Sequence, residues 1–290
     1  MPKASIHLCE VNGSDVKEAP AFELPISDHD IIVGTNKHGT FATWNSLNPD
    51  SPVSPGFAPS GITGLRRLYH ESEKQEHIRL VAQMIIDLFL NGVDALALQE
   101  IPAKSEPYFK PFMQHLEQLA QENQIELDFD AFNISYAQTK KTLKDGLDQG
   151  YHGFATGLLF RKGTFTLNGV TPLAGERGSS YYLTSNKSRE NLTVLNTHGD
   201  YGQPDNVATE IVSALNNPNT IALGDTNIAL TRQEAIAKMT NMKGVVVEPS
   251  SNIEGTATSS RTLDCFVTNI PSTYIFKNDC KNYATGVVET

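Results

Sequence analysis

The stretch Gly224-Asp225-Thr226-Asn227 holds a carboxylate and an amide whose spacing suits chemistry on a phosphate ester. Asp225 and Asn227 are two residues apart, so in extended backbone their side chains point to the same side. The carboxylate can orient or deprotonate a water molecule, while the amide donates a hydrogen bond to a phosphate oxygen. The alternative is structural, because Asp and Asn are both common in the Asx-turn that can follow a residue such as Gly224.

Glu100 is a second candidate, because it follows the apolar run Ala95-Leu96-Ala97-Leu98. A short apolar run of this kind predicts a buried strand. A carboxylate at the end of such a strand is costly unless it has a partner. Carboxylate oxygens are hard ligands that suit Mg²⁺, which keeps most of its waters and uses few protein carboxylates. The alternative is a charged residue that simply ends the strand.

Five motifs, each at the end of an expected strand, follow one another in an order that resembles a known family. In chain order they are Trp44-Asn45, Leu98-Gln99-Glu100, Asn196-Thr197-His198, Gly224-Asp225-Thr226-Asn227 and Arg261-Thr262-Leu263-Asp264. The series resembles that of the endonuclease/exonuclease/phosphatase superfamily, which includes pancreatic-type deoxyribonucleases, abasic-site endonucleases and deadenylases. The resemblance implies an α/β fold, a four-layer sandwich of two mixed β-sheets flanked by helices. It also implies metal-dependent hydrolysis of a phosphate-ester substrate.

The resemblance further implies a role for each matching residue. Glu100 would hold Mg²⁺, with Mn²⁺ as a substitute, and Asn45 would lie beside it. Asp225 would position the nucleophilic water, and Asn227 would contact the phosphate. His198 would bond the scissile phosphate or donate a proton, and the alternative for a lone histidine is a structural role.

Two parts of the series match less closely. Tyr151 corresponds loosely to a family tyrosine that touches phosphate, and a surface-loop tyrosine is the alternative. The family series normally closes with Ser-Asp-His-x-Pro, in which the Asp joins the metal site and the His contacts the phosphate. Here no histidine follows His198, and the nearest counterpart is Asn278-Asp279-Cys280. This makes Asp279 a candidate metal ligand, while Asp264 matches the carboxylate that usually orients the missing histidine.

Three explanations for the missing histidine stay open. The last strand lies outside these 290 residues; or Cys280, His152 or His198 supplies the lost function; or the protein keeps the fold without rapid catalysis. Losing a general acid costs on the order of 10² to 10⁴ in rate without abolishing metal binding. The sequence therefore predicts a phosphoesterase that uses water as nucleophile. The rival hypothesis is a catalytically impaired family member that acts as a binding or scaffold protein.

The hydrophobic pattern predicts alternating strands and helices with several turn-length strand connections, which favours mixed sheets over all-parallel ones. Strands are expected at Ser5–Val11, Phe41–Asn45, Val93–Leu98, Ala155–Arg161, Phe165–Val170, Leu192–Thr197, Thr220–Leu223, Leu263–Thr268 and Tyr274–Lys277. Helices are expected through Ile78–Phe89 and Phe112–Ala120, and from Asp205 and Thr231 onwards. Residues 1–30 are predicted to form an N-terminal extension packed on the domain, and residues 31–290 the endonuclease/exonuclease/phosphatase-like domain.

Composition narrows the classes of function. The chain has 23 Lys and Arg against 33 Asp and Glu, so its net charge is 23 − 33 = −10, which does not support non-specific nucleic-acid binding. The three cysteines have no zinc spacing, and the N-terminal residues lack the apolar core of a secretory signal. No apolar run is long enough to cross a bilayer. We expect a monomer that is cytoplasmic or exported without a classical signal peptide.

Overall fold

The computed structural model describes residues 29, 31–46, 74–104, 106–132, 155–173, 177–199, 209–211, 213–226 and 268–270 with their side chains. It describes the backbone alone for residues 5–6, 9–12, 15–18, 22–23, 71–73, 134–142, 148–154, 204–208, 212, 245–246, 264–267 and 272–278.

Two six-stranded sheets form the centre of the molecule. Sheet I has the order β16 (Ser272–Asn278), β5 (Ile31–Asn36), β6 (Gly39–Asn45), β7 (Ala95–Ile101), β9 (Asp148–Phe160) and β8 (Ile134–Thr142). Sheet II has the order β10 (Phe165–Pro172), β11 (Gly178–Ser185), β12 (Asn191–His198), β13 (Thr220–Asp225), β15 (Asp264–Thr268) and β14 (Val245–Val246). Each sheet contains one parallel pair, β6 with β7 and β12 with β13. The other strand pairs described within the two sheets are antiparallel.

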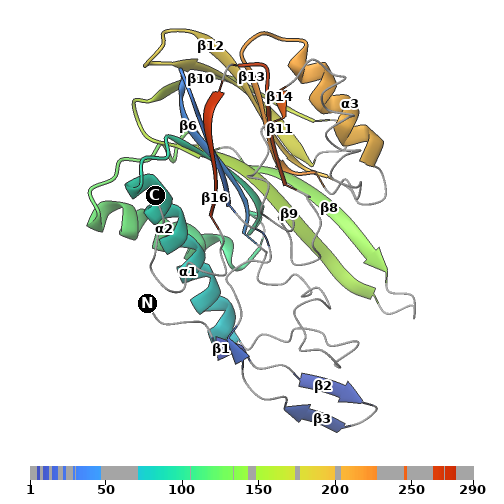
Figure 1. Cartoon of the computed structure of the whole chain (residues 1–290). Coiled ribbons are helices and arrows are strands. Elements are labelled where there is room, and N and C mark those ends of the chain that lie inside the picture. Colours follow the sequence, from blue (N-terminus) through green and yellow to red (C-terminus); the bar gives the residue numbers. More distant parts are fainter. Residues whose placement is uncertain are drawn as a thin grey trace.

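Helices cover the outer faces of the two sheets (Figure 1). Helices α1 (Glu71–Leu90) and α2 (Phe109–Glu122) share one buried cluster with the outward side chains of Sheet I, including Trp44, Leu96 and Leu98. Helix α3 (Pro204–Leu215) contacts β12 and β13 of Sheet II. The predicted four-layer arrangement of two mixed sheets flanked by helices is therefore confirmed.

A second buried cluster fills the space between the sheets. Phe41 and Ala97 of Sheet I meet Val194 and Leu223 of Sheet II in this cluster, and all four are fully buried. Because side chains alternate along a strand, every second residue of β6, β7, β12 and β13 points into this space. The burial of this inner core fixes the register that decides which polar residues face inward at the strand ends.

Most expected elements are confirmed, with ends shifted by a few residues, and three long strands were missed. The Ser5–Val11 strand is found as two short pieces, β1 (Ser5–Ile6) and β2 (Cys9–Asn12), which pair with β4 (Phe22–Glu23) and β3 (Asp15–Glu18). The missed strands are β5, β8 and β11. The helix expected from Thr231 lies outside the described residues, and the division at residue 30 stays a prediction.

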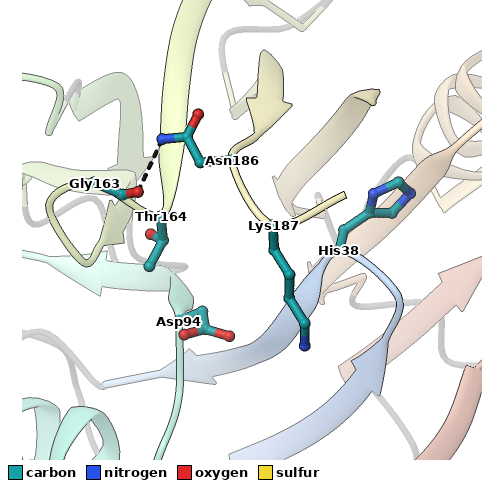
Figure 2. Close-up of a pocket in the computed structure, with 6 residues that line it drawn as sticks. All are labelled: His38, Asp94, Gly163, Thr164, Asn186 and Lys187. Atoms are coloured by element: carbon teal, nitrogen blue, oxygen red, sulfur yellow. Dashed lines mark hydrogen bonds between the residues drawn. The ribbon is translucent and has the colours of Figure 1, made fainter. Parts of the chain in front are cut away.

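A cavity of about 300 Å³ lies among the turns at one end of the sheets (Figure 2). It is lined by His38, Asp94, Gly163, Thr164, Asn186 and Lys187. Across it the Asn186 amide donates to the Gly163 carbonyl, 2.8 Å away. His38 stands just before β6, whereas Asn45 ends that strand, about 20 Å away at 3.3 Å per residue. The cavity is therefore at the opposite end of Sheet I from the motifs that the sequence singled out.

The buried His38 beside this cavity predicts a measurable pH dependence of stability. Burial lowers the pKa of His38 below its ordinary 6.5, the Lys37 charge lowers it further, and Glu190 opposes them more weakly. Below about pH 6.5 the unfolded chain takes up a proton that the folded protein resists, so the free energy of unfolding falls as pH falls towards the folded pKa. We expect His38→Gln to flatten this slope in urea unfolding measured from neutral to mildly acidic pH. His115→Gln, on α2, should keep it, and equal slopes in both variants would contradict the assignment.

No helix within the described part of the chain combines the length and the apolar character that crossing a bilayer requires.

Candidate active site

The carboxyl ends of the two parallel strand pairs carry the candidate catalytic side chains to one place. In Sheet I, Asn45 at the end of β6 pairs with Gln99 of β7, one residue before Glu100. In Sheet II, His198 at the end of β12 pairs directly with Asp225 at the end of β13. Strands β6 and β13 contact each other across the sandwich, as do β7 and β12. Four strands of two sheets therefore converge at one edge.

Strand alternation points three of these side chains into the space between the sheets. Ile221 and Leu223 belong to the inner core, so Asp225, two residues further on, faces the same way. The same rule carries His198 inward from Val194, and Asn45 inward from Phe41. The apolar pattern that builds the inner core therefore also aims the polar residues at its edge.

Glu100 breaks this rule, and a bulge in the backbone corrects its direction. Leu96 and Leu98 face the helices, so strict alternation would send Glu100 outward with them. Instead Glu100 has φ +55°, and the register of β7 against β9 shifts between Leu98 and Ile101. A non-glycine residue in the left-handed region costs on the order of 1 to 3 kcal/mol. β-bulges commonly re-aim side chains next to active sites, and this one brings Glu100 to the amide of Asn45.

A buried pair of amides ties the bulge to the opposite sheet. The Asn196 Nδ2 of β12 donates to the carbonyl oxygens of Leu98 and Gly157 at 3.1 and 2.9 Å, beside the point where the register shifts. Its Oδ1 accepts from Gln99 Nε2 at 2.8 Å, and Gln99 also donates to Thr43 Oγ1 at 3.1 Å. Asn196 and Gln99 are both fully buried. This inter-sheet clasp satisfies carbonyls around the bulge and so holds Glu100 in its strained conformation.

We expect Asn196→Leu to destabilise the protein by about 2 to 4 kcal/mol, because it leaves buried carbonyls without a donor. Urea unfolding of Asn196→Leu beside Asn191→Leu measures this, since Asn191 stands on the same strand with an exposed side chain. Near-equal unfolding midpoints for the two variants would show that the clasp contributes little.

The side chains at the edge form one connected polar cluster. Asn45 Nδ2 donates to Glu100 Oε1 at 3.1 Å and to Asp225 Oδ2 at 3.0 Å. His198 Nε2 lies 3.5 Å from Glu100 Oε1 and 3.7 Å from Asp225 Oδ2. Asn45, His198 and Asp225 are buried, whereas the Glu100 side chain is 13% exposed. The two carboxylates thus share one amide donor and one imidazole at the edge where the four strands converge.

Two glycines allow the strand ends that carry His198 and Asp225 to approach closely. Gly224 has φ +138°, and a methyl group added there would lie 1.9 Å from the Thr197 carbonyl oxygen. A methyl group at Gly199 would lie 1.8 Å from the carbonyl oxygen of Thr226. Both contacts are with backbone, which cannot move aside cheaply. The Gly224 of the predicted motif therefore has a steric role in placing Asp225.

The remaining predicted residues are placed less completely. Asp264 begins β15, and its backbone pairs with Asp225, which puts it at the same edge. Tyr151 lies on β9 where that strand pairs with β8 at Lys140, before β9 reaches β7. The side chains of Asp264 and Tyr151, and the whole of Asn227 and Asp279, lie outside the described residues.

The site contains one histidine that the sequence analysis assigned to the N-terminal extension. His29 is 7% exposed, and its Nε2 lies 3.7 Å from Asp225 Oδ2. Its position follows from a hairpin that was not predicted, in which β5 and β6 are joined by a two-residue turn. The turn sequence between Asn36 and Gly39 was the available signal, because Asn and Gly are favoured around tight hairpins.

Two carboxylates of the cluster offer oxygen atoms of the kind that hard cations prefer. Glu100 and Asp225 offer carboxylate oxygens around Asn45, and Mg²⁺ is usually held by one or two carboxylates together with water. Among the described residues, no group of three His, Cys, Asp or Glu side chains is placed to hold a metal ion. Glu100 is the better candidate ligand, because its side chain is the more exposed of the two carboxylates.

Comparisons with known proteins give structural similarities only. No family model matches the chain, and no curated protein matches it. The endonuclease/exonuclease/phosphatase from Bacteroides vulgatus aligns with 82% of this chain and 87% of its own, at 13% identity and a TM-score of 0.44. A family protein from Bacteroides thetaiotaomicron aligns with 79% and 82%, at 13% identity and a TM-score of 0.45. The human Nocturnin catalytic domain, solved with a bound sulfate, aligns with 84% and 83%, at 14% identity and a TM-score of 0.44. At these values the likeness by itself assigns no activity to this chain.

Proposed function

We propose that this protein is a Mg²⁺-dependent phosphoesterase, which hydrolyses a phosphodiester or phosphomonoester with water as the nucleophile. The supporting observation is the convergence of Asn45, Glu100, His198 and Asp225 from four strands of two sheets. Burying several ionisable groups together is costly, and such clusters concentrate at catalytic sites. A purely structural role would need neither the strained backbone at Glu100 nor the clasp that holds it.

Each side chain has a role that follows from its contacts. Asp225 is buried and accepts a hydrogen bond from Asn45, so its carboxylate is oriented to align a water molecule and accept its proton. Asn45 keeps Glu100 and Asp225 in fixed orientations through one amide group. His198 lies between the two carboxylates, where its Nε2 can donate to a phosphoryl oxygen or to the departing oxygen.

Glu100 would hold the metal ion, and the bulge would present its carboxylate towards the opening of the site. When bound, Mg²⁺ supplies Lewis-acid polarisation of the phosphoryl oxygens and offsets their negative charge. The hydrogen bond from Asn45 would keep the Glu100 carboxylate aimed during turnover, as outer partners of metal ligands generally do.

The substrate is proposed as a nucleotide or another small phosphate ester rather than bulk nucleic acid. The net charge of −10 supports this choice, since non-specific binding of a nucleic-acid backbone needs clustered Lys and Arg. An acidic surface also repels long anionic polymers, whereas a small ester can enter a local site that a metal ion has neutralised.

A turnover assay on a panel of phosphate esters tests the proposal. The panel comprises single-stranded and duplex nucleic acids, nucleotides, phosphoinositides and p-nitrophenyl esters, each with Mg²⁺, Mn²⁺ or a chelator. We expect metal-dependent release of phosphate or a phosphomonoester from at least one class. Absence of turnover throughout, together with intact metal binding, would favour the alternative of a binding or scaffold protein on an impaired enzyme fold.

A further inference from the structure

His29 supplies a second imidazole to the Asp225 carboxylate. Its Nε2 lies 3.7 Å from Asp225 Oδ2, the same oxygen that lies 3.7 Å from His198 Nε2 and 3.0 Å from Asn45 Nδ2. The His29 side chain is 8% exposed, so the imidazole is enclosed in the site. Three nitrogen atoms from three segments therefore surround one carboxylate oxygen.

The topology of Sheet I, not a chance contact, brings His29 to this position. Strand β5 runs antiparallel to β6, with Ile32 opposite Thr43, so the beginning of β5 lies where β6 ends. Asn45 is at that end of β6, and His29 stands two residues before β5. On its other side β5 pairs with β16, which places Ile31 opposite Asn278 and anchors the start of the strand between two neighbours.

The two histidines occupy different positions in the cluster. His198 Nε2 lies within 3.7 Å of both Glu100 and Asp225, and His29 Nε2 lies 3.7 Å from Asp225. His198 therefore lies next to Glu100, which would hold the metal ion, and His29 adds a donor beside Asp225, the proposed water-orienting carboxylate. Phosphoryl transfer spreads negative charge over three equatorial oxygens. If one metal ion and one imidazole each contact one of these oxygens, the third can accept a hydrogen bond from a further donor.

The sequence around His29 carries the triplet that was missing from the expected motif series. Ser27, Asp28 and His29 follow one another directly ahead of β5. The family series places the Ser-Asp-His triplet after the motif that Asp264 matches, where this chain has no histidine; here the triplet precedes Trp44-Asn45. A match of three residues is a weak signal alone. Its coincidence with a buried imidazole at Asp225 makes it informative.

We propose that His29 is a catalytic residue of this site, and that the motif series occurs in circularly permuted order with its Ser-Asp-His element first. His29 donates a hydrogen bond from its imidazole to a non-bridging phosphoryl oxygen next to Asp225. This assignment rests on the proposed phosphoesterase function. With His29 in this role, neither Cys280 nor His152 is needed to supply the function of the missing histidine.

Kinetics of His29→Ala and His29→Gln test the assignment, with His115→Gln on α2 as the matched histidine control. We expect His29→Ala to lower kcat by about 10² to 10³, the usual loss for one donor to a developing oxyanion. His29→Gln retains an N–H donor and should be less impaired. The Mg²⁺ concentration for half-maximal activity should stay at the wild-type value, because Glu100 is intact. Calorimetric titration of the magnesium-loaded protein with orthovanadate should show weaker binding by His29→Ala.

The outcomes separate this assignment from the proposed function. If the wild type turns over a panel substrate and both His29 variants match it, the His29 assignment is wrong and the phosphoesterase proposal stands. If His29→Ala loses activity only by requiring more Mg²⁺, His29 supports the metal site and the assignment is also wrong. If the wild type hydrolyses no ester and binds no orthovanadate, the proposed function fails and His29 has no catalytic role.

Discussion

Asp225→Asn is expected to lower kcat by about 10³-fold while the protein stays folded, because the loss of a general base typically costs 10² to 10⁴ in rate. The side chain keeps its size, and its remaining oxygen can still accept from Asn45 Nδ2. What disappears is the charge that orients water and accepts its proton. Initial rates on the best panel substrate, with circular dichroism melting of the same sample, separate lost chemistry from lost structure.

The matched control for this experiment is Asp130→Asn, because Asp130 is exposed and lies outside the polar cluster. It should behave as wild type in both rate and melting temperature. If Asp225→Asn kept wild-type kcat, Asp225 would not be the water-orienting group, and the measured activity would come from another site or from a contaminant.

Glu100→Gln is expected to raise the Mg²⁺ concentration for half-maximal activity by about 10- to 100-fold, the range seen when groups that support a metal site are altered. The amide retains one oxygen but loses the charge that attracts a hard cation. High Mg²⁺ should therefore restore part of the activity of Glu100→Gln, whereas it should restore none in Asp225→Asn. Titration of the substrate-free proteins with Mn²⁺, followed by electron paramagnetic resonance, measures the same loss without turnover.

Glu117→Gln serves as the control for the metal experiment, because Glu117 is exposed on α2. A wild-type Mg²⁺ activation curve and Mn²⁺ titration in Glu100→Gln would show that the ion is held elsewhere. A second carboxylate from the segments outside the described residues would then be the next to test.

Elements whose residues show a clear apolar periodicity were predicted correctly from the sequence. Helix α1 and strand β7 follow directly from apolar periodicity, and Gly92 ends the helix region with φ +92°, as a C-terminal glycine should. Strand β11 was missed because its sequence, Gly178-Ser-Ser-Tyr-Tyr-Leu-Thr-Ser185, is mostly polar or small. Its pairing with β12 makes it a strand, and pairing partners are not visible in a local window.

The positions of the site residues also follow partly from local sequence patterns and partly from contacts between the two sheets. Asn45, Glu100, His198 and Asp225 were all singled out from strand-end positions, and the structure brings these four together. The direction of Glu100 could not be predicted, because it depends on a bulge held by Asn196 from the other sheet. Asn196 itself was noted only as part of a motif, since its hydrogen bonds cross between sheets and have no sequence spacing.

The sequence by itself determined which chemical groups are available: carboxylates, amides and an imidazole placed after apolar strands, in a chain with more acidic than basic residues. These properties follow from residue type and local periodicity, and both can be read from a short segment of the chain. Only the tertiary structure decided which side chains meet. It turned Glu100 inward, and it brought His29 from ahead of β5 to Asp225, across nearly two hundred residues of chain. Such contacts depend on strand pairing and on the packing of one sheet against the other, and both are properties of the whole fold.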